Sequence, residues 1–149
     1  MTIAGGSLRV GTAFTLTPAV GGARSETIVH IFGGPGDGCF PASIVLEANG
    51  TAYGTTSGDC GGVYGTVFSI LPSGSETVVY SFTDPANGSS PTGIIVAGDG
   101  TLYGVTSYGG AAGYGTVFSL ASQDGSWQEA VLYSFPGVGQ LPKQGYIPA

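Results

Sequence analysis

The chain repeats itself at an interval of 50 residues, and this repeat limits the fold more than any other feature of the sequence. Residues 38–68 align without a gap on residues 88–118. The motif Gly-Thr-x-Phe begins at Gly11, Gly65 and Gly115. We therefore expect a single β-repeat domain. It divides into an N-terminal tail of an earlier unit at 1–10, units at about 11–64 and 65–114, and an incomplete unit at 115–149.

Each unit is predicted to hold four short antiparallel strands. Apolar and polar residues alternate over 66–71, 76–82, 93–97 and 101–106, and turn residues separate these runs. The dipeptide Asp99-Gly100 is typical of a two-residue hairpin turn. Helix formation is opposed by the 29 glycines, so we expect an all-β protein.

Four strands in about 50 residues are typical of a β-propeller blade. The same arithmetic fits a closed β-trefoil or β-prism of three units. Because the last unit is incomplete, we favour a propeller-like fold with a partial set of blades. Unpaired strand edges invite association, so we expect either a homo-oligomer formed through these edges or a piece of a larger propeller.

The charge balance excludes several partners. Three Lys plus Arg against nine Asp plus Glu give a net charge of −6, which disfavours nucleic acid and anionic membrane surfaces. The sequence contains no run of about 18 apolar residues, so no membrane insertion is expected. The first residues lack the basic and apolar regions of a secretion signal.

Three sequence elements occur together in this chain: TLYGVTSYGGAAGYGTVF, SETVVYSF and the Asp99-Gly100 hairpin. Their combination resembles the GloVer-type tandem β-repeats of bacterial surface and secreted proteins. The resemblance covers about Gly11 to Phe135. It implies a propeller-like repeat in an extracytoplasmic or secreted protein, and it brings no catalytic residues.

The two cysteines are candidates for a disulfide. If Asn49-Gly50 forms a two-residue turn, Cys39 and Cys60 face each other across the hairpin, unless Pro41 interrupts the ladder. A disulfide suits an oxidising compartment, and two free thiols suit a reducing one. A zinc site made of both cysteines and His30 is disfavoured, since no two of these ligands are closely spaced.

The only histidine, His30, is the one candidate for a catalytic residue. Its repeat equivalents are Tyr80 and Tyr133, so His30 is interpreted first as a packing position for a flat ring. The alternative is a general base in a specialised unit. No GxSxG nucleophile motif accompanies it.

Loop aspartates are candidate calcium ligands, because calcium prefers oxygen donors. Asp59, Asp84 and Asp99 are the three that we select, and Asp37 and Asp124 also fall in predicted loops or turns. Asp and Asn also support turn geometry without any metal, so calcium is only a candidate cofactor.

Aromatic residues without an aromatic counterpart in the aligned repeat are candidates for surface binding. Tyr108 and Trp127 meet this condition and are the predicted contacts for a glycan or another small molecule. Tyr53 and Tyr103 recur in register and are expected to fill the space between units.

Two functional classes are consistent with these features. The first is a non-catalytic binding or scaffold module that recognises a glycan, a protein partner or copies of itself. The second is a calcium-dependent propeller-type hydrolase acting on lactones or esters, in which the metal polarises a carbonyl group. The scarcity of catalytic residue types favours the first.

Overall fold

The computed structural model describes residues 1–58 and 63–137 and confirms an all-β protein. A short 3-10 turn, η1 (Val20–Gly22), joins the first two strands. No helix in these two ranges is long and apolar enough to span a membrane. The strands are β1 (Thr12–Pro18), β2 (Arg24–Ile31), β3 (Cys39–Leu46), β4 (Ala52–Gly58), β5 (Thr66–Ile70), β6 (Glu76–Ser81), β7 (Ser89–Val96), β8 (Leu102–Tyr108), β9 (Thr116–Gln123) and β10 (Ser126–Ser134).

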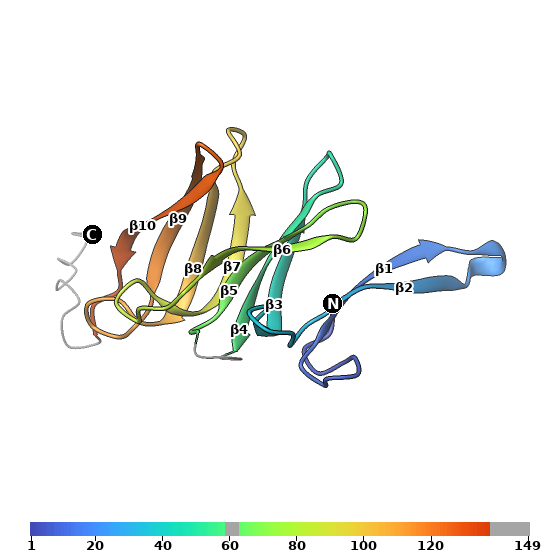
Figure 1. The fold of residues 1–149 in the computed structure, drawn as a ribbon, viewed down its shortest axis with the longest axis horizontal. Coiled ribbons are helices and arrows are strands. Elements are labelled where there is room, and N and C mark those ends of the chain that lie inside the picture. The colour runs from blue at the N-terminus through green and yellow to red at the C-terminus, as the bar shows by residue number, and fades with distance from the viewer. Residues whose placement is uncertain (59–62, 138–149) are drawn as a thin grey trace, which may run out of the picture.

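The strands form three antiparallel sheets that follow one another along the chain. Strands β1 and β2 form a hairpin, β3 to β6 form a four-stranded sheet, and β7 to β10 form another. The two four-stranded sheets stack side by side, with β7 next to β3 and β4, while the β1–β2 hairpin extends away from them (Figure 1). The sheets are not closed on one another, so the arrangement is propeller-like, as expected, and is not a closed trefoil or prism.

The sheets are offset by half a period from the expected units. The unit at 65–114 supplies β5 and β6 to one sheet and β7 and β8 to the next. A repeat reveals the length of its period but not the point at which a sheet begins. Here the loop over 82–88 leads from β6, at the outer edge of one sheet, to β7 in the other.

The predicted two-residue turn at Asp99-Gly100 is wrong. The Ala97 N–H donates to the Thr101 carbonyl at 2.9 Å, and the Gly100 N–H donates to the Ala97 carbonyl at 3.0 Å. The loop therefore contains three residues, including Gly98, and Gly100 has a φ of 83°. A three-residue hairpin loop requires this positive φ at its last position.

Two apolar clusters lie between the sheets. Ala13 and Phe32 of the hairpin pack on Phe68 and Ile70 of the second sheet. The second cluster joins the two four-stranded sheets and contains Val67, Phe82, Ile94, Leu102, Phe118 and Leu120.

Each sheet has two faces, which we name by the neighbouring sheet that they face. The trailing face of a sheet packs on the sheet that follows it along the chain. The face turned to the preceding sheet is its leading face.

Strand β5 shows how one sequence serves both faces. Successive side chains of a strand point to opposite sides, so Val67 lies on the trailing face and Phe68 on the leading face of the same sheet. Both residues are fully buried. This strand is apolar on both sides because it belongs to a sheet that is covered on both sides.

A pair of threonines recurs in each sheet. The hydroxyl groups of Thr2 and Thr12 share a hydrogen bond of 2.9 Å. Equivalent bonds of 2.8 Å and 3.0 Å join Thr56 to Thr66 and Thr106 to Thr116, respectively. In the two four-stranded sheets the pair is buried, so each hydroxyl group satisfies the other away from water.

Candidate functional site

Three ionisable side chains meet between the β1–β2 hairpin and the second sheet. His30 lies near the end of β2, Asp37 in the loop between β2 and β3, and Glu76 at the start of β6. One potential ligand atom from each side chain lies within 4.8 Å of those of the other two. In the described part of the chain this is the one cluster of three or more His, Cys, Asp or Glu side chains with such spacing.

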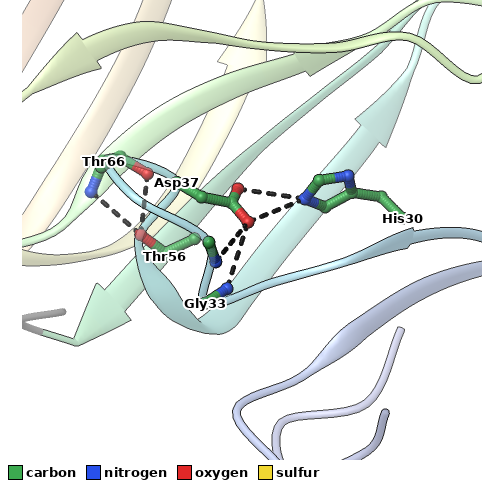
Figure 2. A network of polar contacts seen from close by, with 6 residues as sticks. His30, Gly33, Asp37, Thr56 and Thr66 are labelled. Atoms are coloured by element: carbon green, nitrogen blue, oxygen red, sulfur yellow. Dashed lines mark hydrogen bonds and ion pairs between the residues drawn. The ribbon is translucent and has the colours of Figure 1, made fainter. Parts of the chain in front are cut away.

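The loop that carries Asp37 folds around its own carboxylate. Figure 2 shows this carboxylate facing the His30 ring on one side and the backbone of Gly33 on the other. The N–H groups of Gly33 and Gly34 donate to Oδ2 at 3.1 Å and 3.3 Å. Gly33 has a φ of 103°, a left-handed conformation that glycine adopts readily, so the local sequence fixes the direction of the Asp37 side chain.

The His30 ring is held by Asp37 and by a neighbouring aromatic ring. Its Nε2 lies 3.0 Å from both carboxylate oxygens of Asp37. The ring packs edge-on against Phe32, with 4.7 Å between the ring centroids. The side chains of His30 and Asp37 are 21% and 10% exposed, so the pair is largely shielded from water.

Glu76 approaches this pair from the neighbouring sheet. Its Oε1 is buried and has no hydrogen-bond partner among the residues that the structure describes. Burial raises the pKa of Glu76, the negative charge of Asp37 raises this pKa further, and His30 lowers it. Two carboxylates and one imidazole thus share a small volume between two sheets.

The next pair of sheets carries the same arrangement with different side chains. Tyr80, Asn87 and Glu129 occupy the positions of His30, Asp37 and Glu76. Burial raises the pKa of Tyr80, and the Asn87 side chain lowers it through a hydrogen bond. Only the copy that contains His30 therefore combines a nitrogen ligand with two carboxylates, which could hold a metal ion or support acid–base chemistry.

His30 does more than pack, although its aromatic contact fits the packing interpretation. Of the described residues, only Asp37 forms a hydrogen bond with the His30 ring, and no serine or threonine hydroxyl lies within hydrogen-bond reach of it. A Ser-His-Asp triad is therefore not assembled in 1–58 and 63–137. The role of His30 as a general base stays a prediction.

Two of the aspartates selected as calcium ligands, Asp84 and Asp99, lie in the loops before and after β7, at opposite ends of this strand. Asp84 Oδ1 accepts a hydrogen bond from the Ala86 N–H at 2.8 Å, and Asp99 Oδ1 accepts one from the Thr101 N–H at 2.9 Å. These bonds hold turns, and the bond from Thr101 lowers the pKa of Asp99. Asp59 lies outside the described residues, so calcium binding stays a prediction.

The two selected aromatic residues lie at opposite ends of the last sheet. Tyr108 is exposed at the end of β8 near the start of β9, whereas Trp127 pairs with Ser122 near the end of β9. Trp127 packs against the core between the sheets and contacts Tyr53 edge-on, with 6.2 Å between the ring centroids. The two rings do not form one platform.

The expected register at Cys39 is wrong. Cys39 pairs with Gly58 rather than with Cys60. The hairpin loop after Glu47 contains three residues rather than two, and a bulge lies between Pro41 and Ser43. Cys39 is buried and no described cysteine is free, while Cys60 lies outside the described residues. A disulfide between the two stays a prediction.

The trailing face of the last sheet is exposed and apolar. A shallow hollow of about 370 Å³ lies on it and is lined by Ile95, Tyr103, Val105 and Val117, among others. A second apolar groove, of about 300 Å³, lies between the β1–β2 hairpin and the second sheet. Both hollows are lined mostly by aliphatic and aromatic side chains, and neither contains His30, Asp37 or Glu76.

Stacked four-stranded antiparallel sheets linked from the edge of one sheet to the next define a propeller-type β-repeat protein. The chain belongs to the Gloeobacter/Verrucomicrobia repeat family, whose family model matches residues 1–149. This match confirms the resemblance found in the sequence.

A solved structure is similar in fold. It is the X-ray structure of a protein given the provisional name gluconolactonase, with a TM-score of 0.53 and 12% sequence identity. The match covers 72% of this chain but only 38% of the other one, and at this identity it shows the fold alone. No curated protein matches the chain in a sequence comparison.

Proposed function

We propose that this chain is a scaffold module whose sheets associate head to tail with those of another copy. In this arrangement the trailing face of the last sheet in one copy packs on the leading face of the β1–β2 hairpin in the next. Association therefore takes place through sheet faces rather than through strand edges. This proposal specifies the self-association that the sequence favours.

The observation that supports the proposal concerns one phenylalanine position of the repeat, which occurs in three copies. Phe32, Phe82 and Phe135 each donate a backbone hydrogen bond of 3.0 Å to the glycine of a Gly-Thr-x-Phe motif. Phe32 and Phe82 are 0% exposed because the next sheet covers them, whereas Phe135 is 41% exposed. Leu132 and Tyr133, at the positions of Val79 and Tyr80, are also exposed. The partner that fits this face is another sheet of the same repeat.

The leading face of the hairpin offers the matching surface. Phe14, Leu16 and Ile28 occupy the positions of the leading-face residues Phe68, Ile70 and Val78. Leu16 and Ile28 are exposed. Burying these apolar groups against another sheet is favourable by about 25 cal/mol for each Å² removed from water.

A polar contact gives the interface its register. Within the chain, Glu129 on a leading face interacts with the Tyr80 hydroxyl on the preceding trailing face. Glu26 and Tyr133 hold the corresponding positions on the two exposed faces. We therefore expect Glu26 of one copy to meet Tyr133 of the next.

Sedimentation analysis over a range of protein concentrations tests association. The mass should rise with concentration, because a head-to-tail interface produces rings or filaments. Ile28→Asp and Leu132→Asp should each suppress this rise, while Gln123→Glu, which adds a charge to the β9–β10 hairpin, should not. A wild type that stays monomeric at all concentrations contradicts the proposal.

Mixing the two disabled variants tests the head-to-tail geometry. Ile28→Asp retains an intact trailing face, and Leu132→Asp retains an intact leading face. A 1:1 mixture should therefore form a heterodimer that grows no further. If both variants remain monomeric in the mixture while wild type associates, the interface is not head to tail.

A second candidate is a calcium-dependent hydrolase of lactones or esters. The cluster of His30, Asp37 and Glu76 favours it, because an imidazole beside carboxylates can act as a general base. Proton release in a pH-stat, measured with calcium and with excess chelator, tests this function. Release that needs both protein and calcium and is lost in His30→Tyr supports it, and the absence of release contradicts it.

A further inference from the structure

We infer that His30, Asp37 and Glu76 form a binding site for one divalent transition-metal ion of the Zn²⁺ class. The site is built from two sheets, since His30 and Asp37 belong to the β1–β2 side and Glu76 to β6. It lies apart from the faces that the proposed association uses and does not depend on that association.

The spacing of the three side chains suits a small cation. Their ligand atoms lie within 4.8 Å of one another, and His30 Nε2 is 3.0 Å from Asp37 Oδ1. Two ligands of a tetrahedral zinc ion with bonds of about 2.0 Å lie about 3.3 Å apart. The ion would replace the proton that now joins Nε2 to the carboxylate, and the pair would separate by only a few tenths of an ångström.

The loop holds Asp37 ready for this role. The N–H groups of Gly33 and Gly34 donate to Oδ2, whereas the one hydrogen-bond partner of Oδ1 among the described residues is the His30 ring. Hydrogen bonds from surrounding groups that orient a metal-binding carboxylate are a regular feature of protein metal sites. Oδ1 can therefore bind a cation while Oδ2 keeps the hydrogen bonds donated by Gly33 and Gly34.

An unsatisfied buried oxygen gives a second, independent indication. Glu76 Oε1 is buried and finds no hydrogen-bond partner within 1–58 and 63–137, which is costly for a carboxylate. Glu129 Oε1, in the other copy, is also unpartnered, but its carboxylate faces the Tyr80 hydroxyl, a neutral donor. Glu76 faces no such hydroxyl group, because the residue equivalent to Tyr80 in this copy is His30. Nε2 of His30 is already hydrogen-bonded to Asp37.

The donor set decides the class of metal. One imidazole nitrogen and two carboxylate oxygens suit Zn²⁺ and neighbouring transition ions, whereas Ca²⁺ takes about six to eight oxygen ligands. The two negative charges of the carboxylates also balance the double positive charge of the metal ion. With three protein ligands, a fourth position stays open for water or for a ligand atom.

Titration of the purified, metal-free full chain with Zn²⁺, followed by calorimetry, tests this site. Co²⁺ is a spectroscopic probe, because its visible absorption reports the coordination geometry. We expect one equivalent to bind. Binding should weaken roughly tenfold or more in His30→Tyr and in Glu76→Gln. Glu129→Gln alters the equivalent position of the other copy and should bind like wild type.

His30→Tyr is suited to this test because it gives the first copy the side chain found at Tyr80 and Tyr133, so the variant should fold. Circular dichroism verifies the fold. Zn²⁺ should also raise the melting temperature of wild type but not of this variant. Equal affinity in wild type and His30→Tyr, or no binding of Zn²⁺ and Co²⁺ to wild type, overturns the inference.

Discussion

The ring of Phe118 lies over the bare backbone of Gly104, its partner on the neighbouring strand. A methyl group added to Gly104 would come within 2.3 Å of Phe118 Cζ. The same relationship joins Phe68 to Gly54 in the other four-stranded sheet, also at 2.3 Å. The Tyr-Gly and Gly-Thr-Val-Phe elements of the repeat therefore occur together because the glycine makes room for the aromatic ring.

Gly104→Ala should lower the free energy of unfolding by about 1–3 kcal/mol, because overpacking a filled core forces side chains and backbone to move. Denaturant unfolding measures the change. Gly98→Ala is the matched control, since a Cβ at Gly98 meets nothing within 4 Å. Equal stability of the two variants would contradict this account of the repeat.

Thr56→Val should cost more stability than Thr66→Val. The Thr56 hydroxyl accepts a hydrogen bond from the Thr66 N–H at 3.1 Å and also bonds the Thr66 hydroxyl. Removing it takes these two bonds from the buried N–H and hydroxyl of Thr66, at a cost of about 1–3 kcal/mol. Thermal or denaturant unfolding measures both variants, and a larger loss in Thr66→Val would refute the assignment.

Phe82→Ala and Phe135→Ala alter the same repeat position with different expected results. Phe82 is fully buried, so its truncation should cost about 3–5 kcal/mol. Phe135 is partly exposed, and its truncation should cost about 1 kcal/mol in dilute protein. Unfolding must be measured at low concentration, where the proposed association does not cover Phe135. Similar losses would show that its face is already covered within the chain.

Glu129 should make stability depend on pH. Burial raises its pKa above the ordinary value of 4.5, and the hydrogen bond with Tyr80 lowers it in part. As pH rises above 4.5, the unfolded chain loses this proton before the folded one, so the free energy of unfolding should fall until the raised pKa is passed. Glu129→Gln should flatten this part of the profile.

Denaturant unfolding at several pH values measures the effect of Glu129. Asp124→Asn, in the exposed loop between β9 and β10, removes one charge without changing the core and serves as the control. If the free energy of unfolding depends on pH in the same way in Glu129→Gln and in wild type, Glu129 has the same pKa in the folded and unfolded chain, and the burial argument fails.

Several elements of the fold could be predicted from the sequence. The alternation of apolar residues and the aligned motifs predict the strands, and β5 and β6 lie close to their expected bounds. The phase of the sheets could not be predicted, because Glu76 and Ser89 begin strands that look alike locally but belong to different sheets. Only long-range contacts decide which strands pair.

The candidate site was visible only in part. His30 stands out because its repeat equivalents are tyrosines, and Asp37 is among the loop aspartates. Glu76 was missed, although a glutamate recurs at Glu26, Glu76 and Glu129. The signal lies in two positions that differ together between the copies. One copy has Tyr80 and Asn87, seven residues apart, and the other has His30 and Asp37 at the same spacing.

The sequence by itself determined the repeat, the all-β class and the residues that each sheet buries, because side-chain alternation and motif spacing are local properties. The tertiary structure alone decided where the sheets begin, that Glu76 reaches His30 from another sheet, and that Phe135 lies exposed while Phe82 is buried. These relationships depend on how whole sheets stack on one another. The separation of two residues along the chain does not indicate whether this stacking brings them into contact.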